Sequence, residues 1–222
     1  MKIQYLSDLH LEVAPMDVPV CDADVVVLAG DIHSDGRIAI DWASNFPQEV
    51  IYILGNHEFY SGGTISDLPK DLKNYAEKYS NVHVLNDDSI VIKGIAFHGC
   101  TLWTDFELYG KPDVAFFYAE KSLNDYRLIN FDRRQAFTPA IAAALHMESM
   151  DWLSETICSS KFVNNVVVTH HLPTPDACGR CRVKSQRASR LNGDSGLMFL
   201  LSAFLGTFMR KSLVSKIKVG DR

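Results

Sequence analysis

Four short apolar runs in this sequence each end abruptly in residues that bind metal ions or phosphate. The runs cover residues 2–6, 24–29, 50–54 and 166–169, and they lead into Ser-Asp-Leu-His, Gly-Asp, Gly-Asn-His-Glu and His-His. Apolar runs of this length, rich in valine and isoleucine, are typical of buried strands. The recurrence of one pattern at four places constrains the fold more than any single motif does.

The segments between these runs are either polar or patterned for helices. Apolar residues recur at intervals of three and four in residues 65–79 and 140–157, which predicts amphipathic helices. Residues 89–92 and 95–98 are short β-like runs separated by a Lys-Gly pair, and they predict a hairpin. Strands that alternate with helices predict an α/β fold, in which ligands bind at the carboxyl ends of strands. The four polar endings therefore mark one expected site.

Charge is distributed unevenly along the chain. The net charge of the 222 residues is −5, but residues 1–178 hold 12 Lys and Arg against 25 Asp and Glu, a net of −13. Residues 179–222 hold 10 basic residues against 2 acidic ones, a net of +8. The arginines between residues 180 and 190 make this segment a candidate surface for nucleic acid or another acidic partner.

Neither an export signal nor a membrane span is expected. The first apolar segment meets Asp8 after only a few residues, which is too short for a secretory signal. The longest apolar stretch, residues 197–209, is shorter than the roughly 18 residues that span a bilayer, so we expect a buried or amphipathic helix there. Five cysteines, an odd number at irregular spacing, favour reduced thiols and a cytoplasmic location.

The residue types at the strand ends suit a metal site. Asp8 and His10 are two positions apart, so on an extended segment their side chains would point to the same side and could bind one ion together. Asp31 follows a glycine that permits a tight turn, and its two oxygens suit it to bridge two cations. Asn56 offers a carbonyl oxygen, and His57 an imidazole that titrates near neutral pH. Such oxygen and nitrogen ligands favour Mn, Fe, Zn or Co over a thiolate-rich structural zinc.

The four blocks, in this order, resemble those of the calcineurin-like metallophosphoesterase family. They are Ser-Asp-Leu-His, Gly-Asp, Gly-Asn-His-Glu and Thr-His-His, at residues 7–10, 30–31, 55–58 and 169–171. Supporting stretches at residues 99–106 and 123–129 resemble a bacterial branch of the family. The resemblance implies a four-layer α/β sandwich of two mixed β-sheets flanked by helices.

The resemblance also implies two divalent metal ions at the strand ends, with ligands assigned by position. Asp8 and His10 would hold the first ion. Asp31 would bridge the two ions, and Asn56 with His170 would hold the second. In proteins of this kind, hydroxide activated by the two metals attacks the phosphorus of a phosphate monoester or diester.

Four further residues have implied or open roles. His57 is the implied catalytic residue, which protonates or stabilises the leaving oxygen. His171 stays open as the alternative ligand to His170. Glu58 is expected either to accept hydrogen bonds beside the ligands or to be a carboxylate at a helix start, and Arg127 either to contact substrate phosphate or to form a surface ion pair.

One expected block is absent. The family has a Gly-His-x-His block after a further strand, which gives one more histidine to each metal, whereas this sequence has no histidine after His171. We therefore expect a phosphoesterase domain over residues 1–178 with incomplete C-terminal strands, followed by a divergent basic segment over residues 179–222. Two alternatives to an active hydrolase follow: a catalytically impaired remnant, or a binding protein that uses the basic segment.

Overall fold

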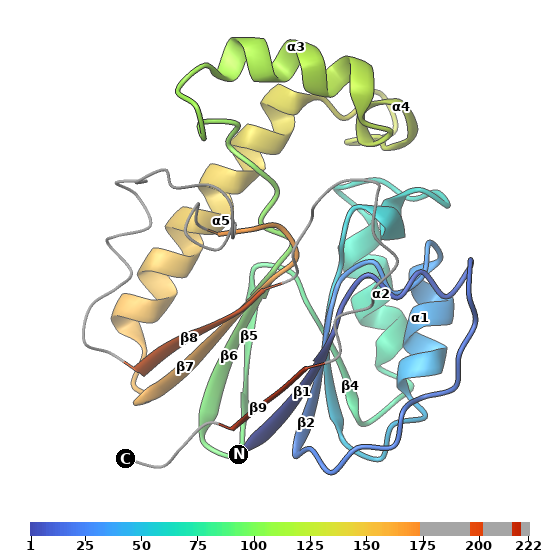
Figure 1. The fold of residues 1–222 in the computed structure, drawn as a ribbon, viewed down its shortest axis with the longest axis vertical. Coiled ribbons are helices and arrows are strands. Elements are labelled where there is room, and N and C mark those ends of the chain that lie inside the picture. The colour runs from blue at the N-terminus through green and yellow to red at the C-terminus, as the bar shows by residue number, and fades with distance from the viewer. Residues whose placement is uncertain (174–195, 202–214, 219–222) are drawn as a thin grey trace.

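The computed structural model of the chain describes residues 1–173, 196–201 and 215–218 (Figure 1). The first of its two sheets has five strands in the order β4-β3-β2-β1-β9, in which β1 to β4 are parallel and β9 is antiparallel to β1. These strands are β1 (Lys2–Leu6), β2 (Val25–Ala29), β3 (Glu49–Ile53), β4 (Val82–Leu85) and β9 (Ser215–Lys218).

The second sheet has four strands in the order β5-β6-β7-β8. β5 and β6 form the antiparallel hairpin that the sequence predicts, and β7 and β8 continue the sheet in parallel. These strands are β5 (Asp88–Ile92), β6 (Ile95–Cys100), β7 (Asn164–Thr169) and β8 (Gly196–Leu201).

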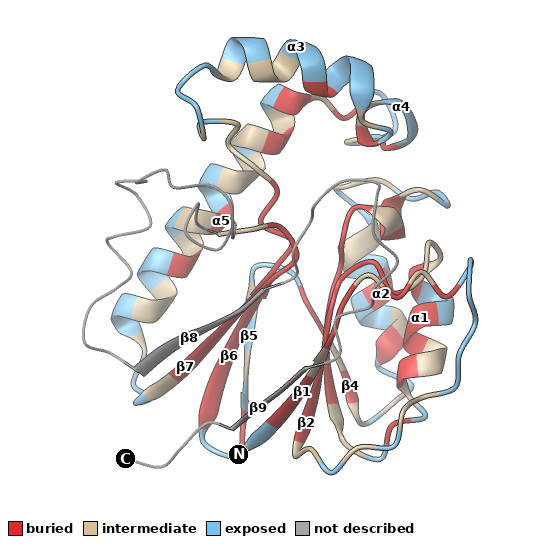
Figure 2. Cartoon of the chain, in the orientation of Figure 1, coloured by how far each residue is buried: buried red, intermediate tan, exposed pale blue. Residues whose placement is uncertain are grey.

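Alternate side chains of β2 show how the layers pack. Val25 and Val27 face the second sheet, in a core shared with Phe97 of β6. Val26 and Leu28 face the opposite side, in the core under the helices. Successive side chains of a strand point to opposite faces, so a strand apolar at every position must be covered on both sides. Figure 2 shows this burial along the middle strands of both sheets.

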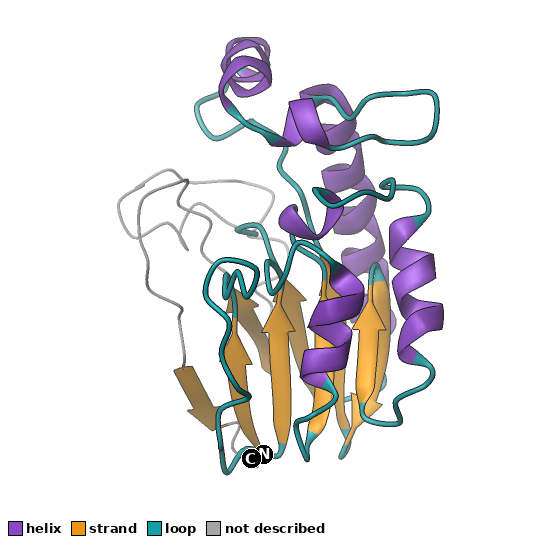
Figure 3. Cartoon of the chain, turned by 90° about the vertical axis from the view of Figure 1, so that its right-hand side faces the viewer, coloured by secondary structure: helices purple, strands orange, loops and turns teal. Residues whose placement is uncertain are grey.

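Helices cover the two outer faces. α1 (Gly36–Ala43) and α2 (Leu68–Ala76) pack on the first sheet, and the long helix α5 (Pro139–Ser159) packs on the second. The order helix, sheet, sheet, helix confirms the predicted four-layer α/β sandwich. α3 (Pro112–Ser122) and α4 (Asp125–Leu128) lie beyond the carboxyl ends of the strands (Figures 1 and 3).

The apolar stretch at residues 197–209 does not begin as the expected helix. Residues 196–201 form β8, which pairs with β7, so the helix prediction is wrong for that part. A short apolar run fits a buried strand as well as a helix, and the open edge of β7 offers backbone partners. Residues 202–209 and the basic residues 180–190 lie outside the described residues. The incomplete C-terminal strands and the boundary at residue 178 stay predictions.

Among the described helices, none combines the length and apolar character needed to cross a membrane.

Candidate metal centre

The loops that follow β1 and β2 run side by side and carry three of the expected ligands. Backbone N–H groups of Asp8 and His10 donate to the carbonyl oxygens of Gly30 and Asp31, both at 3.1 Å. Asp8, His10 and Asp31 have φ of 54°, 47° and 55°, in the left-handed region, where Asp and His are enriched among non-glycine residues. The assumption of an extended Asp-x-His segment is therefore wrong. The side chains still converge, because atoms able to bind a metal on all three residues lie within 4.8 Å of one another.

Asp31 lies between two histidines that come from different sheets. Its Oδ2 lies 3.9 Å from Nε2 of His10, and its Oδ1 lies 3.5 Å from Nε2 of His170, which follows β7. The Asp31 side chain is almost completely buried. Burial, together with the nearby carboxylates of Glu58 and Asp8, raises the pKa of Asp31 against the opposing effect of His170. One carboxylate oxygen of Asp31 thus lies toward His10 and the other toward His170.

His170 and Asn56 are held with their acceptor atoms facing each other. The Nδ1–H group of His170 donates to the carbonyl oxygen of Ala29 at 2.9 Å, which leaves Nε2 turned inward. The amide nitrogen of Asn56 donates to Oδ1 of Asp125 at 2.8 Å, so the amide oxygen faces Nε2 of His170 at 3.2 Å. Both orientations are fixed by partners that only accept hydrogen bonds.

This donor set fits a cation. In neutral His170, Nε2 carries a lone pair, and it meets the acceptor oxygens of Asn56 and Asp31 at 3.2 and 3.5 Å. Three lone pairs so close repel one another unless positive charge lies between them. Burial lowers the pKa of His170, but the carboxylates of Asp31 and Asp8 outweigh it and raise this pKa overall. The same carboxylates that stabilise a proton on His170 would stabilise a metal ion there. The nitrogen and oxygen ligands suit a divalent transition metal.

Two glycines allow this close approach. A Cβ on Gly30 would overlap Nδ1 of His170 and lie 2.7 Å from the backbone nitrogen of Gly55. A Cβ on Gly55 would overlap Oδ1 of Asp31 and lie 2.8 Å from Cε1 of His170. A side chain at either position would push the expected ligands apart, so only glycine fits at these positions of the Gly-Asp and Gly-Asn-His-Glu blocks.

Glu58 fixes the loops after β2 and β3 to each other. Its buried carboxylate accepts from the backbone N–H groups of Asp31 at 3.0 Å, Ile32 at 2.8 Å and Gly55 at 2.8 Å. It also accepts from the hydroxyl of Tyr52 at 2.8 Å. Of the two readings left open by the sequence, this geometry matches the one in which Glu58 accepts hydrogen bonds beside the ligands, although the residue also lies in the short 3₁₀ helix η1 (His57–Phe59).

His57 lies at the start of η1, next to His10. Its backbone N–H donates to Oδ1 of Asp31 at 3.0 Å, and its ring lies 4.5 Å from that of His10 and stacks on Tyr60 at 4.3 Å between centroids. Burial, followed by the neighbouring His10, lowers the pKa of the His57 imidazole. The lowered pKa favours the neutral ring, which can both donate and accept a hydrogen bond.

The structure separates the two adjacent histidines. His170 faces Asp31 and Asn56, whereas His171 stacks on Trp103 at 5.3 Å between centroids and has Nδ1 at 3.2 Å from the carbonyl oxygen of Thr101. Burial, followed by the charge of His170, lowers the pKa of His171 to about 3. This placement supports His170 as the ligand.

Arg127 lies on α4 and is exposed, with its guanidinium donating to the side chain of Asn124 at 2.7 Å. Contact between Arg127 and substrate stays a prediction. Sequence reasoning missed two acidic residues at the site: Glu12, which lies within reach of His10 and His57, and Asp125, which orients Asn56. Asp125 belongs to the Asn-Asp-Tyr-Arg stretch, in which the sequence assigned a role only to Arg127.

Comparison with known proteins agrees with the geometry. The chain is 27% identical over 195 residues to "Uncharacterized protein L509" of Acanthamoeba polyphaga mimivirus, and the alignment covers 77% of this chain and 68% of that protein. The sequence profile of the calcineurin-like phosphoesterase family matches residues 1–199, which runs past the expected boundary at residue 178. Proteins of this family typically bind two divalent metals. With most of its length matched, the chain belongs to the calcineurin-like phosphoesterase family.

Proposed function

We propose that the chain is a metal-dependent phosphoesterase that uses two divalent ions to hydrolyse a phosphate monoester or diester. One observation carries the proposal: the buried carboxylate of Asp31 has one oxygen toward His10 and the other toward His170. Asp8, His10 and Asp31 would hold the first ion. Asp31, Asn56 and His170 would hold the second.

When bound, two divalent ions activate water and neutralise the charge that develops on the phosphoryl oxygens. The residues of the chain supply the fixed geometry. Glu58 holds the Asp31 and Gly55 loops in place, and Asp125 keeps the amide oxygen of Asn56 turned inward. A neutral His57 at the edge of the site stabilises the leaving oxygen by donating a ring N–H hydrogen bond.

The absence of a Gly-His-x-His block sets the conditions of the test. Loss of an interaction at a metal site commonly weakens metal binding or activity by about 10 to 100-fold, so both ions are expected to bind weakly. The purified chain is therefore titrated with Mn²⁺ or Co²⁺ into the millimolar range. Hydrolysis of p-nitrophenyl phosphate and bis(p-nitrophenyl) phosphate is then followed at each metal concentration.

The proposal expects hydrolysis of at least one ester to rise with metal and to be abolished in Asp31→Ala. Glu49→Gln is the matched control, because Glu49 pairs with His83 at 2.6 Å on the strands β3 and β4, outside the proposed site. The control is expected to retain activity. Two bound metals without hydrolysis of either ester would instead identify the chain as a catalytically impaired member of the family.

A cytoplasmic location forms part of the proposal, supported by the unpaired thiols of Cys21, Cys100 and Cys158 among the described residues. Binding of nucleic acid by the basic segment stays a prediction.

A further inference from the structure

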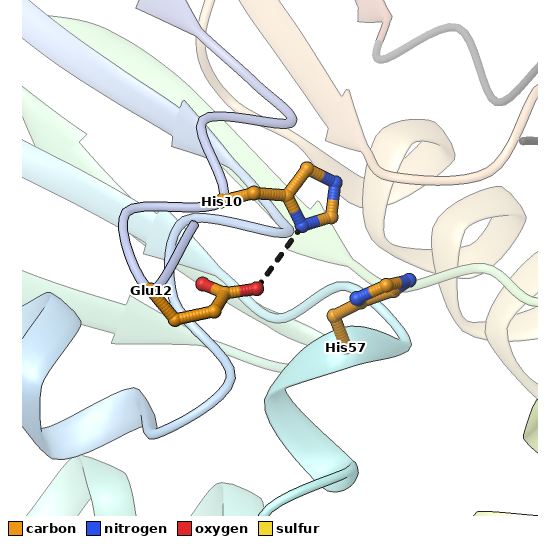
Figure 4. A group of neighbouring side chains, drawn as sticks. All are labelled: His10, Glu12 and His57. Atoms are coloured by element: carbon orange, nitrogen blue, oxygen red, sulfur yellow. Dashed lines mark hydrogen bonds and ion pairs between the residues drawn. The ribbon is translucent and has the colours of Figure 1, made fainter. Parts of the chain in front are cut away.

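Glu12 lies two residues after His10 on the same loop and points back toward its ring. Oε1 of Glu12 lies 3.3 Å from Nδ1 of His10 (Figure 4). His57 faces the pair from the neighbouring η1, and the three side chains offer metal-binding atoms within 4.8 Å of one another. Neither the family resemblance nor the sequence pattern assigned a role to Glu12.

The second oxygen of Glu12 is also engaged. Oε2 accepts from the backbone N–H of Ser34 at 3.2 Å, in the loop that follows β2. Glu12 thus joins the loop that carries His10 to the loop that carries Asp31. Glu58 joins the Asp31 loop to the Gly55 loop in the same way. Two glutamates therefore tie three successive strand-end loops together by accepting hydrogen bonds on both carboxylate oxygens.

The contact to His10 has a chemical consequence. A carboxylate only accepts hydrogen bonds, so Nδ1 of His10 carries a proton, and in the neutral ring Nε2 keeps its lone pair, 3.9 Å from Oδ2 of Asp31. A histidine that binds a metal usually donates its other N–H to a carboxylate or carbonyl, which fixes the ring and raises the basicity of the ligand nitrogen. His170 has this arrangement through the carbonyl of Ala29.

We infer that Glu12 is a positioning residue that sets the tautomer and orientation of His10 for the first metal. The inference rests on the proposed function, since it needs a metal at Nε2 of His10. The competing role for Glu12, as a ligand of its own with His10 and His57, is disfavoured because both its oxygens already accept from protein donors.

The test uses Co²⁺ titration of the full chain, followed by calorimetry and by the visible absorption of bound Co²⁺. Glu12→Ala removes both contacts, whereas Glu12→Gln keeps one acceptor for His10. Glu49→Gln is the control, since it alters another glutamate–histidine pair that lies outside the site. Glu12→Ala is expected to weaken one of two Co²⁺ sites by about 10 to 100-fold, with Glu12→Gln affected less and the control unchanged.

A second measurement does not depend on metal. Ring ¹⁵N chemical shifts of His10 in the metal-free protein are expected to report the Nδ1–H tautomer in the wild type and a mixture of tautomers in Glu12→Ala. A structural role alone would not change this tautomer. Urea unfolding of the metal-free variants identifies any general loss of stability. If Glu12→Ala does not fold, the same measurements are made on Glu12→Gln.

The outcomes separate the inference from the proposed function. A wild type that binds no Co²⁺ would overturn both. Two Co²⁺ sites in the wild type with unchanged affinity and tautomer in Glu12→Ala would overturn the positioning role alone. A third Co²⁺ lost in Glu12→Ala would also overturn it, in favour of Glu12 as a ligand.

Discussion

Replacing Glu58 by glutamine tests how the loops of the candidate site are held. The buried carboxylate accepts from three backbone N–H groups and from the hydroxyl of Tyr52, two donors to each oxygen. Glutamine has the same shape but places an NH₂ group where one oxygen was. If that group faces Ile32 and Tyr52, the hydroxyl rotates to accept, and the N–H of Ile32 is left buried without a partner.

The expected loss of stability follows from these contacts. An unsatisfied buried N–H costs about 1 to 3 kcal/mol. The two hydrogen bonds that remain change from charge-assisted to neutral and weaken by about 1 kcal/mol each. Glu58→Gln is therefore expected to lower the free energy of unfolding by about 3 to 5 kcal/mol, a large share of the roughly 5 to 15 kcal/mol typical of a domain.

The assay is urea unfolding of the metal-free protein, followed by the fluorescence of its three tryptophans. Glu49→Gln is the matched control, since it changes a half-buried carboxylate paired with His83 and is expected to cost less than about 1 kcal/mol. A loss below about 1 kcal/mol in Glu58→Gln would refute the reasoning, because the four donors would then find other partners at little cost.

Substitutions at three further positions test other parts of the site. Gly55→Ala is expected to weaken metal binding at least about 10-fold in calorimetry, because the new Cβ would overlap Oδ1 of Asp31. An unchanged metal affinity would contradict the close approach of Gly55 to Asp31. Asp125→Ala is expected to weaken metal binding by about 10-fold, because the amide of Asn56 loses the acceptor that orients it. Asp125→Asn keeps an acceptor oxygen and is expected to bind metal nearly as the wild type does. Equal effects of the two substitutions would exclude the orienting role. His171 has a pKa of about 3 in the folded chain and about 6.5 in the unfolded chain, so between pH 8 and pH 5 it binds a proton only in the unfolded state. Lowering the pH from 8 to 5 is therefore expected to lower the free energy of unfolding by about 2 kcal/mol. His171→Phe removes this contribution in urea unfolding with chelator present, and an identical pH dependence in variant and wild type would count against it.

The sequence predicted the strands and the sheet edge that holds the candidate site because both depend on local pattern, whereas the arrangement in two sheets was implied by the family resemblance. Residues 24–29 and 166–169 are apolar at nearly every position, which requires burial on both faces, and parallel strands bring their carboxyl ends to one edge. The prediction for residues 197–209 was wrong at its start because an apolar run does not distinguish a strand from a helix.

The missed residues depend on contacts that no local pattern reveals. Asp125 meets Asn56 across 69 positions of sequence, and Glu12 meets the N–H of Ser34 across 22. In the sequence, each is only one acidic residue among 27. The left-handed backbone of Asp8 and His10 was also unforeseen, since the hydrogen bonds to the neighbouring loop that accompany it form only in the folded chain.

The two proposed metal sites differ in the contacts that hold their ligands in place. The ligands of the first, Asp8, His10 and Asp31, all follow strands of the first sheet, and neighbouring loops there are joined by backbone hydrogen bonds and by Glu12. The second site combines Asn56, which follows a strand of the first sheet, with His170, which follows a strand of the second. Its geometry therefore depends on how the two sheets pack as well as on the loops. Asp31 belongs to both sites, and His170 also donates a hydrogen bond to the carbonyl oxygen of Ala29, just before the Asp31 loop, so a shift of the sheets reaches the first site through both contacts. The hydrogen bonds that Glu58 accepts from the N–H groups of Asp31 and Ile32 oppose such a shift.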